Sequence, residues 1–165
     1  KFNYNWTQYS HPEDYPSIPH FSPLVGVSHT RFYTLWNNNG FANKGIQDIA
    51  ELGSTVSAIK EFKSERNTFN YSIGKLSDPV DTDMVTVTMR GAVKQTFLSA
   101  AAMIAPSPDW FVGFSRVQMC ENYRWVSFMT GVLVGFDAGT DSGLTYMAPD
   151  QPTRPYQTIR RFLGS

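Results

Sequence analysis

The segment PSPDWFVG at residues 106–113 and the segment DAGTDSG at residues 137–143 are the most informative parts of this chain. Both lie beside strongly apolar stretches, and their prolines and glycines bend or stiffen the backbone, so we expect loops at the ends of buried strands. Carboxylates that crowd one edge of a fold repel each other unless a hard cation neutralises them. Calcium suits such an edge because it takes about six to eight oxygen ligands. The segments therefore predict a calcium site formed by Asp109, Asp137 and Asp141.

Two further roles are open to the same aspartates. Aspartates in glycine-rich loops often cap turns through local hydrogen bonds to the backbone. Paired carboxylates also serve as acid and base in glycosidases, and Ser107 or Ser115 can be combined with a histidine on paper. The chain has no Gly-x-Ser-x-Gly elbow, however, and chain order alone does not identify a triad. We therefore expect no enzyme.

The apolar patterns predict an all-β fold. Alternating or compact apolar runs predict strands at residues 2–7, 30–36, 85–89, 97–104, 110–117, 125–129, 131–136 and 156–162. Residues 10–23 hold four prolines and predict a long loop. Many short strands separated by turn residues are typical of an antiparallel β-sandwich.

One region departs from this pattern. Apolar residues at helical spacing predict one or two short helices around residues 44–64. Gly53 is placed to end the first helix and Ser54 to cap the second. We expect these helices as an insertion beside the sandwich.

Length and charge exclude several classes of protein. The 165 residues suit a single domain spanning 1–165. Acidic and basic residues balance at 14 each, which argues against nucleic acid as a partner. No apolar stretch reaches the roughly 18 residues that a membrane span requires. The chain begins with Lys1 rather than Met, which suggests a processed or trimmed chain.

Cysteine, asparagine and histidine residues offer weaker candidate sites. Cys120 is the single cysteine and is interpreted either as a small buried hydrophobe or as the source of an interchain disulfide. Asn5 and Asn70 begin glycosylation sequons, and Asn70 is the better candidate because Asn5 falls in a predicted strand. His11, His20 and His29 are too dispersed to favour zinc. For His29 we expect a hydrogen bond that supports the fold.

The aromatic content suggests a second kind of function. The chain has 12 Phe, 8 Tyr and 4 Trp, which is more than a sandwich of this size buries easily. The rings expected at the surface are those of Tyr9, Tyr15, Phe41, Tyr123, Tyr146 and Tyr156. Exposed aromatic patches mark ligand or partner sites. The alternative function is therefore a carrier of an apolar small molecule, either a lipid or a pigment such as a carotenoid, held between subunits of a homo-oligomer.

The two segments quoted above resemble the signature of the spondin domain family, of the F-spondin and mindin type. Further matching blocks are Phe21–Gly26, Ser28-His29, Leu35-Trp36, Gly45-Ile46 and Ala50–Gly53, so the resemblance runs from about Tyr4 to Pro149. It implies an antiparallel β-sandwich similar to a C2 domain, with calcium at Asp109, Asp137 and Asp141. Family members use disulfides near the position of Cys120, but this chain has no second cysteine to complete one within itself.

The resemblance also implies a setting and a class of partner. Members are secreted and extracellular, and the implied ligands are extracellular matrix, cell surfaces or microbial glycans. Members often carry thrombospondin-type repeats, and none is present in these 165 residues. The leading hypothesis is a stand-alone calcium-binding adhesion module, a glycoprotein if a sequon is used.

Overall fold

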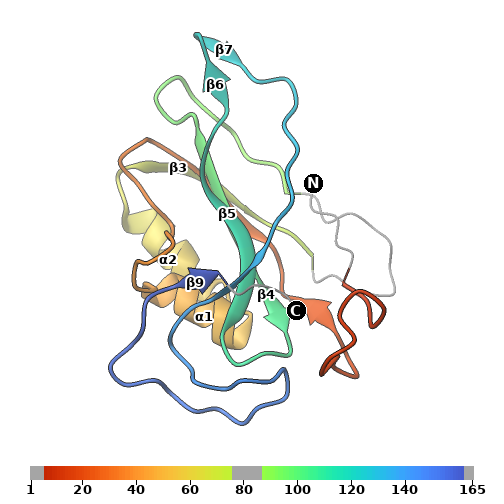
Figure 1. Ribbon diagram of the computed structural model, residues 1–165. Helices are drawn as coiled ribbons and strands as arrows, with labels where there is room; N and C mark the ends of the chain where they lie inside the picture. Colours follow the sequence, from red (N-terminus) through yellow and green to blue (C-terminus); the bar gives the residue numbers. More distant parts are fainter. Residues whose placement is uncertain (1–5, 76–86, 162–165) are drawn as a thin grey trace.

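The structure is a computed structural model that describes residues 6–75 and 87–161. Two helices, α1 (Lys44–Leu52) and α2 (Val56–Ser64), lie among nine strands (Figure 1). The strands are β1 (His20–Phe21), β2 (Val25–His29), β3 (Thr68–Ile73), β4 (Phe97–Ala105), β5 (Trp110–Gln118), β6 (Cys120–Glu121), β7 (Arg124–Trp125), β8 (Gly135–Asp137) and β9 (Arg160–Arg161). The predicted all-β, sandwich-like fold with inserted helices is confirmed.

One antiparallel sheet dominates the fold. Its strand order is β3-β2-β4-β5-β8-β9, and β1 pairs with the far end of β4. β4 and β5 form the central hairpin, in which Ala101 is paired with Gly113. A Cβ atom at Gly113 would lie 2.2 Å from the carbonyl oxygen of Ala100, so this register requires glycine. β6 and β7 form a separate small ribbon that continues from the end of β5 (Figure 1).

The sheet is covered on both faces. The helices pack against one face, where Val27, Ile46 and Phe111 belong to the larger core cluster. The segment that precedes β2 covers the other face, where Trp6 and Phe21 belong to a second cluster. β4 is almost continuously apolar because a central strand must be compatible with a core on each side.

The two helices confirm the prediction made from the helical spacing of apolar residues at 44–64. The Asn43 side chain caps α1 by accepting a hydrogen bond from the Ile46 amide (2.8 Å), and Gly53 ends α1 with a left-handed φ of 63°. The expectation for Ser54 was wrong, because Thr55 occupies the N-cap position of α2 and makes no side-chain cap bond. The Ser54 amide instead donates to the Asp48 carbonyl at the end of α1.

Several predicted strands were wrong or too long. Residues 30–36 form turns, because the Thr30 amide bonds to the Asn67 carbonyl and the Tyr33 amide bonds back to the Thr30 carbonyl. The side chains of Tyr33, Leu35 and Trp36 are buried nonetheless, so the apolar pattern reports burial without a strand. Residues 87–89 are not in a strand, and the rest of the predicted strand at 85–89 lies outside the described residues.

The remaining strand predictions differ mainly in length. The strands near residues 125, 135 and 160 are only two or three residues long, and Trp6 and Thr7 are not in a strand. The apolar patterns did not predict β2 and β3, which are adjacent in the sheet. The long strands β4 and β5 extend as predicted.

His29 supports the fold through hydrogen bonds, as expected. Its ring is fully buried, and the nitrogen Nδ1 donates to the Thr30 carbonyl (2.7 Å). The other nitrogen, Nε2, accepts from the Ser99 hydroxyl (2.8 Å), and the Ser99 oxygen accepts from the Arg116 amide (2.9 Å). These bonds link β2, β4 and β5 where the pairing of β4 with β5 shifts register.

Candidate metal centre

The three predicted aspartates lie at one end of the sheet. Asp109 immediately precedes β5, and Asp137 is the last residue of β8. β5 and β8 are antiparallel neighbours in which Trp110 is paired with Asp137. The Ala138 amide donates to the Asp109 carbonyl (3.0 Å). The two segments singled out in the sequence are therefore adjacent in the fold, and we call their shared end the acidic edge (residues 106–109 and 137–143).

Asp109 is the most deeply buried of the three. Its side chain is fully buried, and its oxygen Oδ2 accepts hydrogen bonds from the amides of Thr140 (2.7 Å) and Asp141 (3.0 Å). Its other oxygen, Oδ1, is buried and has no hydrogen-bond partner among the described residues. A buried carboxylate oxygen without a partner is costly, and a bound cation would remove that cost.

Asp137 and Asp141 make the local hydrogen bonds that turn capping predicts. Asp137 accepts from the Gly139 amide (2.7 Å), and Asp141 accepts from the amides of Gly143 (2.8 Å) and Gln151 (2.5 Å). In residues 6–75 and 87–161, no group of three or more acidic, histidine or cysteine side chains is arranged to hold a metal ion. The three aspartates therefore share one edge, and their carboxylates would have to turn toward a common ion before all three could bind it. Each oxygen that accepts one bond retains a further lone pair.

The carboxylates of the acidic edge influence each other's ionisation. Burial, reinforced by the negative charge of Asp137, raises the pKa of Asp109 to about 6 despite the hydrogen bonds that it accepts. Burial also raises the pKa of Asp137, and the charge of Asp141 acts in the same direction. The Gly139 amide and the positive charge of Arg160 oppose that rise. The edge is therefore a place where negative charge is disfavoured until a cation compensates it.

Two glycines allow the acidic edge to close tightly, as the sequence suggested. Gly139 has a left-handed φ of 74°, and a Cβ atom there would lie 2.4 Å from the Gln157 carbonyl oxygen. A Cβ atom at Gly143 would lie 2.6 Å from the Pro108 ring. Gly143 thus permits the close contact between the segment that carries Asp141 and the segment that carries Asp109.

The sequence patterns did not reveal the residues that complete this edge. Besides its amide, Thr140 directs its hydroxyl at Asp109 (3.3 Å). The amide of Gln157 donates to the Gly139 carbonyl (2.8 Å), and the amide of Ser142 donates to the Gln151 carbonyl (2.9 Å). These C-terminal residues form no periodic pattern, so only their proximity in the folded chain reveals their role.

The other candidate sites are partly described. Cys120 is a free, half-buried residue of β6, and nothing in the structure tests an interchain disulfide. Asn70 lies in β3, where its side-chain oxygen accepts from the Arg90 amide (2.9 Å). Asn5 lies outside the described residues. Ser107, considered above for catalysis, accepts a hydrogen bond from the Trp110 amide (3.1 Å).

The surface aromatic residues separate into two groups. Tyr9, Phe41, Tyr123 and Tyr156 are exposed as predicted. The predictions for Tyr15 and Tyr146 were wrong, because both rings are partly buried against Trp6, with centroids 5.7 and 5.3 Å from its ring.

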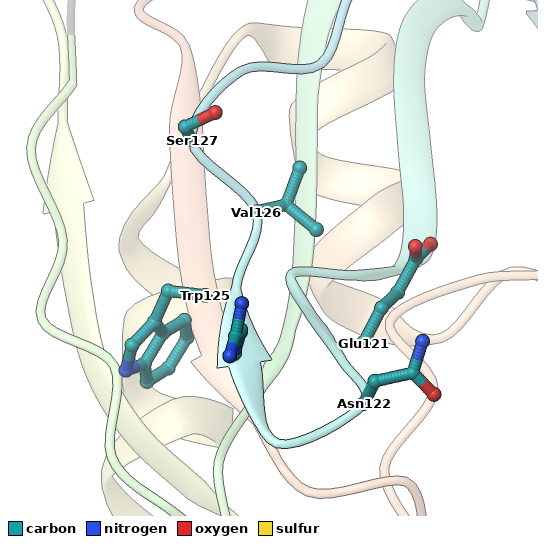
Figure 2. Close-up of a pocket in the computed structure, with 6 residues that line it drawn as sticks. Glu121, Asn122, Trp125, Val126 and Ser127 are labelled. Carbon is teal, nitrogen blue, oxygen red and sulfur yellow. The ribbon is translucent and has the colours of Figure 1, made fainter.

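Two surface pockets lie away from the acidic edge. The larger, of about 550 Å³, is lined by Glu121, Asn122, Arg124, Trp125, Val126 and Ser127 (Figure 2). In Figure 2 the Trp125 side chain extends to one side of the hairpin, and Glu121 and Asn122 lie on the other. The second, of about 450 Å³, lies along α2 and is lined by Val56, Ile59, Lys60, Lys63 and Ser64.

Comparison with known proteins gives a consistent result. The family model described as Spondin_N matches residues 1–165. Spondin-1 of Rattus norvegicus is 36% identical over 166 residues, which cover 94% of this chain and 20% of that protein. Spondin-1 of Homo sapiens is 36% identical over 167 residues with the same coverage.

A second group of relatives is shorter. Spondin-2 of Rattus norvegicus is 30% identical over 170 residues, which cover 99% of this chain and 52% of that protein. The chain therefore spans about a fifth of the Spondin-1 proteins and about half of Spondin-2.

Proposed function

The chain belongs to the Spondin_N family, and from this membership we propose that it is a secreted module that binds extracellular matrix or cell surfaces. The resemblance of its two acidic segments to the spondin domain supports the extracellular setting. Within residues 6–75 and 87–161, no helix is long and apolar enough to cross a bilayer. The chain corresponds to only part of its relatives. We therefore propose, rather than infer from those relatives, that its partners are extracellular matrix, cell surfaces or microbial glycans.

We further propose that the acidic edge binds one calcium ion through Asp109, Asp137 and Asp141. The observation that carries this proposal is the fully buried Asp109 carboxylate, whose Oδ1 has no partner among the described residues. Its neighbour Asp137 adds negative charge, so the chain's own hydrogen bonds leave the edge uncompensated. The ion would supply positive charge, and backbone carbonyls and water would complete its shell of oxygen ligands.

In this proposal the protein groups have separate tasks. Thr140 and the Asp141 amide hold the Oδ2 oxygen of Asp109, which leaves Oδ1 for the ion. The turn bonds from Gly139 and Gly143 fix the backbone that carries Asp137 and Asp141. Calcium would then stabilise the loop edge on which partner surfaces depend, and no catalytic step is assigned to it.

Thermal unfolding with calcium and with a chelator tests the metal proposal. A ligand that binds only the folded protein adds about 2.7 kcal/mol at a hundredfold excess over its dissociation constant. We expect a calcium-dependent rise in melting temperature that is weakened in Asp137→Asn and in Asp141→Asn.

The matched control is Asp150→Asn, because Asp150 is an exposed carboxylate near the same loop. It should keep the full response to calcium. Two results would contradict the proposal: calcium does not change the melting temperature of the unmodified protein, or it raises that of all three variants equally. The aspartates would then be turn-capping residues only.

The alternative of an apolar carrier gains no support. Both pockets are surface hollows, one beside the β6–β7 ribbon and one along α2. The large interior rings pack on each other instead. For example, the ring of Trp36 lies 4.5 Å from that of Phe136 and 5.2 Å from that of Phe111, measured between centroids.

A further inference from the structure

A group of exposed apolar side chains lies at the end of the sheet opposite the acidic edge. We call it the hairpin surface, and its members are Val93, Tyr123, Trp125, Phe128 and Met129. Tyr123 is 104% exposed at the turn between β6 and β7, and Phe128 is 80% exposed in the segment that follows. Large apolar side chains at a protruding turn do not stabilise the fold of the chain itself. Exposed apolar patches of this kind mark sites of contact with a partner.

Two separate segments build this surface. A Cβ atom at Gly91 would lie 2.6 Å from the Trp125 ring, so the indole rests against the turn that leads into β4. Ala92 and Gln95 close that turn with a bridge. Figure 1 shows β6 and β7 projecting beyond the main sheet, well away from the loop that follows β8. The surface is therefore formed by the tips of two neighbouring segments.

The hairpin surface is also basic. Arg90 and Lys94 are exposed on the turn that contacts Trp125, and Arg124 is exposed on the ribbon itself. Glu121, paired with Arg124 across the ribbon, is the acidic residue of the β6–β7 ribbon. Within a chain of zero net charge, this end carries an excess of positive charge while the opposite end carries the buried aspartates.

We infer that the hairpin surface docks onto an anionic phospholipid membrane. The three aromatic side chains expose on the order of 500 Å² together, taking about 200 Å² for each fully exposed ring. Tyrosine and tryptophan favour the boundary between hydrocarbon and headgroups. Basic side chains beside them are attracted to anionic headgroups. The protein lies on the bilayer through these tips and does not cross it.

The charges and the side-chain types select this partner over two others. A symmetric contact between two copies would place the same patch against itself, and Arg90, Lys94 and Arg124 would then face their own like charges. An anionic polysaccharide would satisfy the charges, but it offers nothing to Val93 and Met129. An anionic lipid surface matches both the apolar and the basic side chains.

Docking through the hairpin surface does not depend on calcium. β5 begins beside Asp109 and ends before Cys120, and its nine residues span about 30 Å at about 3.3 Å per residue. The hairpin surface and the acidic edge therefore lie too far apart to bind one headgroup. Membrane docking goes beyond the adhesion module proposed above, and it can succeed or fail independently of the metal site.

The test is co-sedimentation with vesicles in the presence of a chelator. We expect the protein to bind vesicles of phosphatidylcholine mixed with phosphatidylserine and not vesicles of phosphatidylcholine alone. Phe128→Ser should lower binding about tenfold or more, since it removes a large apolar side chain from the contact. Lys94→Gln should lower binding about fivefold, which is the effect of one basic residue at an anionic surface.

Each variant has a matched control elsewhere on the surface. Leu144→Ser removes an 89% exposed apolar side chain near the acidic edge, and Lys60→Gln removes an exposed lysine on α2. Both should bind vesicles like the unmodified protein. A blue shift of tryptophan emission on binding, lost in Trp125→Phe, would place the contact at the hairpin surface.

Several results would overturn the inference. Binding that requires calcium and is lost in Leu144→Ser would assign the membrane contact to the acidic edge instead. Binding to heparin but not to vesicles would assign the surface to polysaccharide. Self-association that Phe128→Ser abolishes, with no vesicle binding, would assign it to a second copy of the chain.

Discussion

The two ends of β5 use their side chains in opposite ways. At the acidic edge, the Asp109 carboxylate is fully buried and is surrounded by backbone amides. At the hairpin surface, Tyr123 and Phe128 are largely exposed. Polar groups are thus inside at one end, and large apolar groups are outside at the other. Each arrangement is unfavourable for an isolated chain, so each indicates a ligand or partner.

The two ends also differ in how the backbone is held. The loop from Asp137 to Gly143 is bonded to the C-terminal segment through Gly139 and Thr140, which accept from Gln157 and Thr153. The β6–β7 ribbon has two residue pairs, a backbone bond from Val126 to Met119 and a side-chain bond from Gln118 to the Cys120 carbonyl. We therefore expect substitutions at the acidic edge to change the free energy of unfolding, and substitutions at the hairpin surface to change binding.

The largest expected difference comes from the same substitution in the loop after β8 and in the segment that joins β7 to β8. Gly139→Ala introduces a Cβ atom 2.4 Å from the Gln157 carbonyl oxygen at a residue with a φ of 74°. Strain and crowding together should lower the free energy of unfolding by about 3 kcal/mol. Gly131 has open space around it, so Gly131→Ala should change stability by less than about 1 kcal/mol.

Urea unfolding with a chelator present measures both variants without a contribution from bound metal. Comparable losses in the two variants would show that the backbone is held equally in the two segments. A loss confined to Gly139→Ala would support the difference drawn above and would identify the C-terminal segment as part of the acidic edge.

The next effect concerns His29, which lies at the hairpin end of the sheet, opposite Phe97. Burial, together with the positive charge of Arg116, lowers the pKa of His29 below its usual 6.5. As the pH falls below 6.5 the unfolded chain takes up the proton first, so stability is lost; above 6.5 both states are neutral and this histidine adds no pH dependence. The loss should grow as the pH falls toward the lowered pKa of the folded protein and then level off.

The free energy of unfolding, measured from neutral to mildly acidic pH for the unmodified protein and for His29→Gln, checks the predicted pH dependence. The variant should be less stable than the unmodified protein at neutral pH, and the difference should narrow as the pH falls. His20→Gln is the control, because the bond from His20 Nδ1 to the nearby Ile18 carbonyl is local and exposed. A constant difference between His29→Gln and the unmodified protein would show that His29 has the same pKa in the folded and the unfolded chain.

The sequence predicted the acidic edge better than it predicted the strands. Asp109, Asp137 and Asp141 were placed at one edge because each follows or precedes a long apolar run, and such runs report burial reliably. Calcium at this edge stays a prediction. The hydrogen bonds from Thr140 to Asp109 and from Gln151 to Asp141 were not predictable. Bonds between loops that are distant in the sequence produce no periodic pattern of residues.

The strand errors have a different physical cause. Residues 30–36 form no strand, because loop hydrogen bonds replace the strand pairing while the core still buries Tyr33, Leu35 and Trp36. β2 escaped prediction because Gly26 and Ser28 interrupt its apolar pattern, although every residue of β2 is buried. The helices were predictable because Gly53 and the apolar stripe agree with the tertiary packing.

The smallest expected effect is on stability at the hairpin surface itself. Phe128 and Leu144 are 80% and 89% exposed at opposite ends of the molecule, so Phe128→Ser and Leu144→Ser should each change the free energy of unfolding by less than about 0.5 kcal/mol. Thermal unfolding of both variants in chelator provides the comparison. A clear loss in Phe128→Ser alone would mean that this ring packs within the free chain, and it would then be inaccessible to a membrane. Equal and negligible changes would leave the exposed ring without any role in folding, so that its effect on vesicle binding would measure contact with lipid directly.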